Sequence, residues 1–157
     1  MVAGDTTIQQ VLEAVAEQVA TVPGLKGAYA NDRSKLGQTP CVVFSFFSPL
    51  PTALTHGSTQ LWIANATATL YGGPIKGNPQ VQVDIEEYQQ LIHPIVDIIS
   101  QHPQKYPYGS KMAALTGVDR IAVTSIRPAQ FGLVYAGHSY YGAEMNVEIK
   151  LHRRISY

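Results

Sequence analysis

Five histidines and one cysteine are the side chains of this 157-residue chain best suited to catalysis or metal binding. His93 and Asp97 are four residues apart, so they share one face of an expected helix. Tetrahedral and octahedral metal sites need more ligands than these two. We therefore expect no metal site and interpret His93 as a hydrogen-bonded or solvent-facing side chain. The remaining histidines are scattered without ligand spacing: His56, His102, His138 and His152.

Other residues that could do chemistry have plainer explanations. Cys41 opens a very apolar segment, where cysteine usually serves as a small buried hydrophobe. The glycine-rich stretch 72–78 lacks the Gly-Lys-Ser/Thr ending of a phosphate-binding loop. Asn65-Ala66-Thr67 matches a glycosylation acceptor, but it lies within an expected strand of a chain that shows no signal-peptide pattern. The sequence displays no catalytic constellation, so we expect a protein that is not an enzyme and needs no cofactor.

The charge balance excludes one large class of partners. Eleven basic and eleven acidic side chains cancel, and charged residues make up only 14% of the chain. Proteins that bind nucleic acid through its phosphates carry a basic excess, which is missing here. The only local basic cluster is Lys150, His152, Arg153 and Arg154, which we interpret as a solvated strand end or as a contact for an acidic partner. A net charge near zero removes a barrier to self-association.

The segment from Ala143 to His152 organises the expected fold. Apolar and polar residues alternate there without a fault, which predicts a long strand with one buried face. A register slip of one residue would bury its carboxylates and lysine, so this strand fixes the pairing of its neighbours. We expect it to organise an antiparallel sheet.

Two amphipathic helices are expected to cover that sheet. The first runs from Ile8 to Val22, capped by Asp5, Thr6 or Thr7 and stopped by Pro23-Gly24. The second begins near Asp84, with Glu87 completing a capping box, and Pro94 should kink it. A short helix is expected between Ser110 and Leu115.

Strands fill the rest of the chain. Segment 41–47 is apolar on both sides, which predicts a central strand buried on both faces. Segment 61–71 predicts a third long strand with a face of alanines, while 49–57 and 72–79 read as a polar turn region and a projecting loop. A short extended piece is expected around 28–30. The chain should finish as a meander: a strand over 118–126, a turn over 127–130, an extended segment over 131–136, and the closing strand.

The element order of helix, strands, helix and strands, joined by hairpins rather than regular crossovers, predicts the α+β class. We expect a single domain over residues 1–157: a mainly antiparallel or mixed β-sheet, two main α-helices packed against it, and a C-terminal β-hairpin. The longest apolar run is too short to span a bilayer, so we expect no membrane segment and synthesis in cytoplasm.

Three stretches give the chain a family resemblance. They are the opening helix running into Val22-Pro23-Gly24-Leu25, the loop followed by a helix in the middle, and the ending 126–132 and 136–144 before the alternating strand. Together they resemble the tail terminators, or tail completion proteins, of long-tailed bacteriophages, which include the lambda-like minor tail protein U. The similarity spans nearly the whole chain, although its motifs are loose.

The resemblance implies a structural virion protein at the junction of tail and neck. Such a protein forms a ring, commonly a homohexamer, that caps the tail tube, stops its polymerisation and offers a surface for head joining. Its implied partners are other copies of itself, the major tail tube protein and the head-closure or stopper protein, while genomic DNA passes through the lumen without specific binding. Neutral charge suits that lumen, because a basic lining would hold phosphates.

Residues expected at subunit or partner contacts lie in the glycine-rich loop, the segment before the closing strand, and the basic end. They are Gly72, Gly73, Ile75, Lys76, Asn78, Arg127, Gln130, Phe131, Tyr135, His138, Tyr140, Arg153 and Arg154.

Other functions remain open at this stage. A head-closure, stopper or other neck subunit is the alternative within the same assembly. An enzyme would lose activity on changing His93, Asp97 or Cys41 with the fold intact, and a monomeric ligand-binding or adaptor domain would be separated by its mass in solution.

Overall fold

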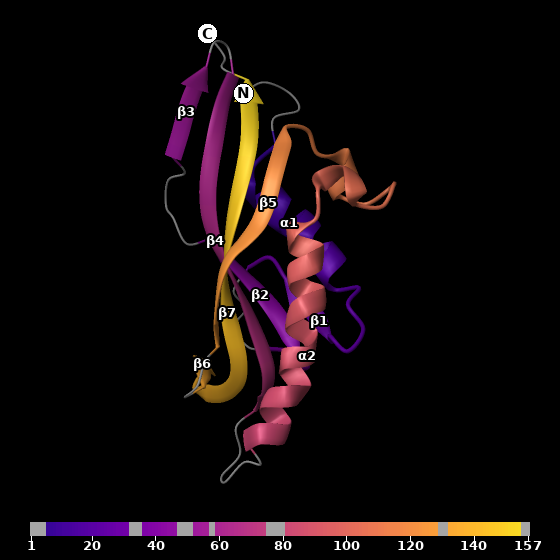
Figure 1. Ribbon diagram of the computed structural model, residues 1–157, viewed down its shortest axis with the longest axis vertical. Coiled ribbons are helices and arrows are strands. Elements are labelled where there is room, and N and C mark those ends of the chain that lie inside the picture. The colour runs from indigo at the N-terminus through magenta and orange to yellow at the C-terminus, as the bar shows by residue number, and fades with distance from the viewer. Residues whose placement is uncertain are drawn as a thin grey trace.

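The computed structural model describes residues 6–31, 36–46, 52–56, 59–74, 81–128 and 132–154. These residues form two α-helices, two short 3-10 helices and a seven-stranded sheet (Figure 1). The helical elements are α1 (Ile8–Val19), α2 (Val81–Ser100), η1 (Pro103–Lys105) and η2 (Met112–Ala114). The strands are β1 (Gly27–Tyr29), β2 (Cys41–Phe46), β3 (Thr52–His56), β4 (Thr59–Pro74), β5 (Val118–Pro128), β6 (Leu133–Tyr135) and β7 (His138–Arg154).

The sheet is mixed, and its main strand order is β1-β2-β4-β7-β5. β1 and β2 pair in parallel, whereas the remaining pairs are antiparallel. β3 pairs with the start of β4, and β6 pairs with the start of β7. This arrangement confirms the expected α+β fold with a C-terminal hairpin.

The closing strand is central, as its alternation predicts. β7 lies between β4 and β5 and pairs with β4 from Tyr140 to Arg154. Its apolar side chains are buried: Ala143, Met145, Val147, Ile149 and Leu151. Burying a side chain of valine, leucine, isoleucine or methionine size contributes about 1.5–3 kcal/mol, so this face holds the register firmly.

Helix α1 begins and ends close to the predicted positions. Thr7 is its N-cap and forms a capping box with Gln10, because the Thr7 hydroxyl accepts from the Gln10 amide and the Gln10 side chain accepts from the Thr7 amide. The helix ends at Val19, followed by a turn up to Gly24, which has a φ of +96°. Its buried side includes Val11, Leu12 and Val15.

Helix α2 differs from its prediction at one end. It begins at Val81, three residues before the expected start at Asp84, and continues without interruption across Pro94 to Ser100. Ile95 and Ile99 are fully buried, so its second half packs firmly on the sheet. Figure 1 shows α2 lying along one face of the long strands.

The main core lies between the two helices and one face of the sheet. β4 contributes Ala64, Ala66, Ala68 and Leu70, as its alternation predicts. The small alanines let helical side chains approach the strand closely. β2 is buried on both faces, because Val42 and Phe44 join this core while Cys41 and Val43 join a second, smaller cluster on the opposite face.

Several loop predictions are wrong because long-range pairing extends the strands. Residues 72–74 belong to β4, and the pairing of β4 with β7 shifts register between Tyr71 and Pro74. β3 lies inside the expected turn region 49–57. Arg127 and Pro128 continue β5 instead of turning, because they pair with Glu144 and Ala143 of β7.

The expected absence of crossovers is also wrong. α2 links β4 to β5, and both strands run antiparallel to β7, which lies between them. The connection from β4 to β5 therefore crosses over β7, the last strand of the chain. β7 lies between β4 and β5 and forms antiparallel hydrogen bonds with both.

Candidate interaction surfaces

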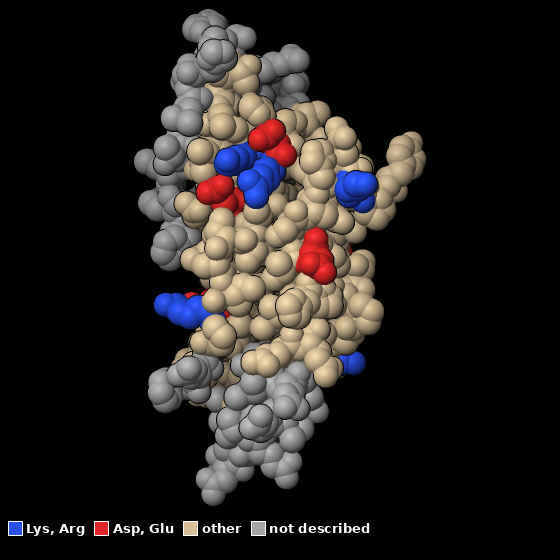
Figure 2. All heavy atoms as spheres, in the orientation of Figure 1, with Lys and Arg blue, Asp and Glu red and all other residues tan. Residues whose placement is uncertain are grey.

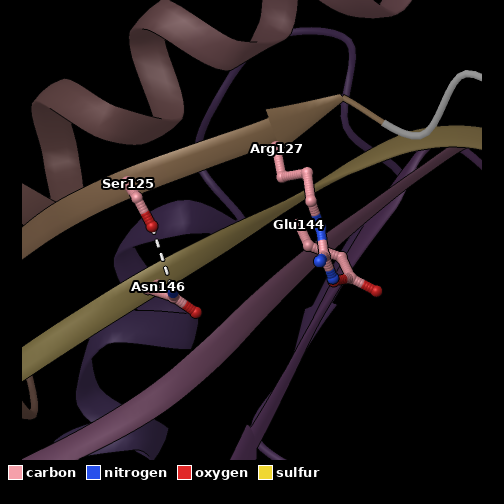
Figure 3. Close-up of polar contacts among 4 residues, drawn as sticks. All are labelled: Ser125, Arg127, Glu144 and Asn146. Atoms are coloured by element: carbon pink, nitrogen blue, oxygen red, sulfur yellow. Dashed lines mark hydrogen bonds and ion pairs between the residues drawn. The ribbon is translucent and has the colours of Figure 1, made fainter.

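The sheet face opposite the helices carries a ladder of polar side chains across β5 and β7. Arg127 stands directly opposite Glu144 and forms an ion pair with it. Ser125 stands opposite Asn146, whose amide donates to the Ser125 hydroxyl at 2.8 Å (Figure 3). Direct cross-strand pairs of this kind each contribute roughly 0.2–1 kcal/mol. These two polar pairs help to fix the register of β5 against β7 on the exposed face, where the paired side chains are not buried.

Charge on the same face is more crowded toward the end of β7. Arg120 and Lys150 stand opposite each other in the register, although like charges in such positions are destabilising. Oε1 of Glu148 lies 3.9 Å from Nζ of Lys150, and Oδ1 of Asp119 lies 3.6 Å from Nε2 of His152. Figure 2 shows charged side chains of both signs gathered over β5 and β7, on a surface that otherwise carries few charges. The signs are mixed, so this region is not a basic patch.

A second apolar cluster closes the other end of this face. Tyr71 makes edge-to-face contacts with Tyr135 and Tyr140, at ring-centroid distances of 5.3 and 5.7 Å. Leu133, Cys41 and Val43 belong to the same cluster. Tyr135 and Tyr140 were expected to project toward a partner, but both are half-buried against Tyr71. Their first role is to hold the β6–β7 hairpin on β4.

The free edge of β5 is poorly suited to pairing with another strand. The amide of Val123 donates to the Ser100 hydroxyl at 3.1 Å, so one edge group is already used. Pro128 has no amide hydrogen, and the pairing is irregular between Val118 and Arg120 and between Val123 and Ser125. Prolines and bulges are the usual devices that protect an edge strand. Contacts along this edge therefore have to be made by side chains, and Ile126 is exposed there.

A projecting segment between α2 and β5, residues 103–115, carries the most exposed aromatic side chain of the described residues. We call it the Tyr108 arm. Tyr108 is fully exposed, and Figure 1 shows the arm extending to one side of the molecule beyond the end of α2. A groove of about 540 Å³ runs beside it, and none of its lining residues is charged: Pro103, Gln104, Tyr106, Tyr108, Met112, Ala113, Leu115, Gly117 and Val118.

A second depression lies between α1 and β1, and we call it the α1–β1 hollow. Its volume is about 380 Å³, and its lining combines small apolar and charged residues: Glu13, Ala16, Glu17, Ala28, Tyr29, Ala30, Asn31 and Lys111. Glu17 accepts a hydrogen bond from the Lys111 amide at 3.3 Å, which ties the arm to α1.

The contact residues expected from the sequence lie in β4, β5, β6 and β7 or outside the described ranges. Gly72 and Gly73 lie in β4, and Arg127 lies in β5 with its guanidinium on Glu144. His138 is exposed at the start of β7. Arg153 and Arg154 pair with Gln60 and Thr59 of β4. The remaining residues lie outside the described ranges: Ile75, Lys76, Asn78, Gln130 and Phe131.

The residues considered for chemistry do not come together. His93 and Asp97 are exposed on α2, and Cys41 is fully buried at the start of β2. Within the described ranges, no group of three or more His, Cys, Asp or Glu side chains could hold a metal ion. None of the helices in these ranges is long and apolar enough to cross a membrane.

Sequence reasoning missed Tyr108. The signal for it was local, because Pro107 and Gly109 flank an aromatic residue in a segment between two regular elements. Such flanks predict a turn whose central side chain points outward. Burial of the neighbouring Tyr106 raises its pKa to about 12, against the lowering effect of a hydrogen bond with Gln101. The Tyr106 hydroxyl donates to the carbonyl of Ile98 at 2.9 Å, so this neighbour is an anchor.

Neither a scan against protein-family models nor a search of curated proteins finds a match to this chain. The fold and surfaces define a single-domain α+β protein whose distinctive exposed features are a polar sheet face and a projecting aromatic arm.

Proposed function

We propose that this protein is the subunit of a ring that caps the tail tube of a long-tailed bacteriophage, stops tube polymerisation and offers the surface to which the head joins. The observation that carries the proposal is the closing hairpin. Among the residues of the family resemblance, 126–128 end β5, and 136–144 form the β6–β7 turn and the start of β7. These two segments are neighbours in the sheet, because Arg127 and Pro128 pair with Glu144 and Ala143.

The layering of the fold supports a role in assembly. Both helices cover one face of the sheet, so the opposite face and the two ends remain available for neighbours. Contacts between different surfaces of identical subunits produce a closed ring when the rotation between them closes. A homohexamer is the copy number that the resemblance implies.

The charge of the chain suits the proposed lumen. Its formal net charge is zero, and the exposed sheet face carries ion pairs of opposite charge on β5 and β7. Such a surface offers little attraction to phosphate groups, so genomic DNA can pass without being held. The proposed protein partners are the tail tube protein below the ring and the head-closure protein above it.

The ring is proposed to form mainly on the tube. A subunit that assembled freely would cap nothing, so contacts between subunits should be individually weak and completed by the tube, which raises their effective concentration. Light scattering over a concentration series, with and without assembled tail tubes, tests this expectation. We expect monomers alone and bound rings with tubes. Protein that remains monomeric in the presence of tubes of its own phage would overturn the proposed function.

A further inference from the structure

The backbone turn that carries Tyr108 is fixed by a hydrogen bond. The amide of Ser110 donates to the Pro107 carbonyl at 3.1 Å, and Gly109 has a φ of +86°, which is the signature of a type II turn with Tyr108 at its second position. Both flanks are anchored in the protein. Tyr106 and Ser110 are buried, and the Ser110 hydroxyl accepts from the amide of Ala113 at 3.3 Å. Tyr108 is therefore displayed from a fixed turn.

A fully exposed aromatic ring on a fixed turn is suited to binding. A tyrosine ring buries about 150–250 Å² in a contact and brings a hydroxyl group that can pair at the far end. Because the turn is already ordered, little backbone entropy is lost on docking. Buried tyrosines are among the residues that most often dominate the free energy of interfaces.

The α1–β1 hollow offers a matching receptor. Three of its lining residues are alanines, which leave room for a ring, and its rim carries the carboxylates of Glu13 and Glu17 as acceptors for a phenol hydroxyl. These glutamates lie four residues apart on α1, where like charges repel, and Glu17 lies in the last turn, where the helix dipole disfavours a carboxylate. Among the described residues, neither carboxylate forms an ion pair.

The charges of arm and hollow are complementary. The arm carries Lys105 and Lys111 and no acidic residue, so its charge is +2. The hollow carries two carboxylates and the ammonium of Lys111, which makes its net charge −1. The arm of a neighbouring copy brings two further ammonium groups, those of its Lys105 and Lys111, toward carboxylates that repel each other in the isolated subunit. Complementary charge of this kind favours productive encounters and excludes wrong partners.

We propose that the Tyr108 arm of one subunit docks in the α1–β1 hollow of a second copy of this chain. In the part of the chain that the structure describes, the Tyr108 tip of the arm does not line the hollow, whose only arm residue is Lys111. Each copy can therefore give one contact and receive one, which is the geometry of a head-to-tail ring. The inference deepens the proposed function and rests on it in taking the partner to be a neighbouring subunit. The contact between the Tyr108 arm and the α1–β1 hollow is small enough to be weak in free solution.

Disulfide trapping of variants with one introduced cysteine tests the contact even when it is short-lived. Pro107→Cys protein, which keeps the Tyr108 ring, is mixed with Ala30→Cys protein carrying a tag that changes its size, and the rate of mixed-dimer formation is measured under mild oxidation. Pro107 is exposed beside Tyr108. The control mixture pairs Pro107→Cys with Val134→Cys, because Val134 is 72% exposed and lies outside the hollow. Cys41 is fully buried and stays in every variant.

We expect the Pro107–Ala30 cysteine mixture to cross-link about tenfold faster than the control, because docking of the Tyr108 ring raises the effective concentration of the two thiols. Replacing Glu13 with glutamine in the Ala30→Cys partner should slow the reaction, and added salt should slow it as well. Equal rates in the two mixtures would overturn the proposed contact.

A double variant with both cysteines separates the possible geometries. Head-to-tail docking produces ladders beyond the dimer, whereas products that stop at the dimer would contradict the ring geometry. Tube-capping by untrapped wild-type protein is scored separately. Capping without preferential cross-linking would overturn this contact alone, and preferential cross-linking without capping would overturn the proposed function alone.

Discussion

Replacing Gly142 with alanine should be among the most damaging single changes in this protein. Gly142 lies in β7 opposite Tyr71 of β4. A Cβ atom placed there would lie 1.9 Å from the carbonyl oxygen of Leu70 and 2.7 Å from Cδ1 of Leu133. Real Cβ atoms essentially never come within 3.0 Å of another heavy atom, so the β4 backbone would have to move by about 1 Å. The obstacle is a main-chain oxygen, which no rotamer change can remove.

The cost follows from what that movement disturbs. Overpacking a well-packed region costs about 1–3 kcal/mol. Weakening one or two neighbouring bonds of the β4–β7 ladder adds about 1 kcal/mol each. We therefore expect Gly142→Ala to lower the free energy of unfolding by about 2–5 kcal/mol, and the midpoint of thermal unfolding by roughly 4–20 °C.

Gly73 provides a matched control in the neighbouring strand. It also lies in a paired strand, but a Cβ atom there would meet nothing within 4 Å. Gly73→Ala should be neutral or stabilise by up to about 1 kcal/mol, because alanine reduces the entropy of the unfolded chain. Urea unfolding followed by circular dichroism measures both variants. If the two substitutions had equal effects, or if Gly142→Ala stayed within about 0.5 kcal/mol of wild type, the proposed backbone clash would be wrong.

Three further predictions concern the core, a turn and a buried phenol. Ile149→Ala should cost about 2–5 kcal/mol because it empties the buried face of β7, while Glu148→Ala should stay within about 0.5 kcal/mol; urea midpoints in the opposite order would reverse the facing of the strand. Ala136→Asn should stabilise the protein by about 0.5–1 kcal/mol. Ala136 has a φ of +50° and precedes Gly137 in a two-residue hairpin turn, which favours Asn-Gly. A lowered urea midpoint would count against this turn type. The pKa of Tyr106 is raised to about 12, so its stabilising contribution is complete below pH 10 and is lost as the pH rises toward 12; Tyr106→Phe should show a shallower loss of stability over that range, and an unchanged slope would refute the assignment.

Local patterns were enough to predict the elements whose burial is one-sided. Alternation alone placed Met145, Val147 and Ile149 of β7 on the core face, because a strand in any context points successive side chains to opposite sides. The spacing of apolar residues likewise predicted α1, and its N-cap is Thr7, one of the three expected caps. These properties depend on residues close together in the sequence.

The limits of the strands depended on residues far away in the sequence. Gly72 and Gly73 carry a local loop signal, yet they lie in β4 beside a β7 strand that extends back to His138. Arg127 carries a turn signal but lies opposite Glu144, with which it forms an ion pair. Pairing with a partner strand outweighs a weak local preference, and the sequence does not state which strand the partner is.

The candidate interaction surfaces also depend partly on local sequence and partly on the fold. A turn at Pro107-Tyr108-Gly109 can be predicted from the sequence, because glycine readily supplies the positive φ that the third position of a type II turn requires. That its ring is fully exposed was decided by the tertiary structure, since Tyr106 and Ser110 on either side are buried. The α1–β1 hollow also exists only in the fold, because it joins Glu13 and Glu17 of α1 to Ala30 beyond β1 and Lys111 of the arm. Side chains separated by so many residues meet only when the whole core forms, so the sequence determined the separate surfaces and the tertiary packing determined which of them lie together.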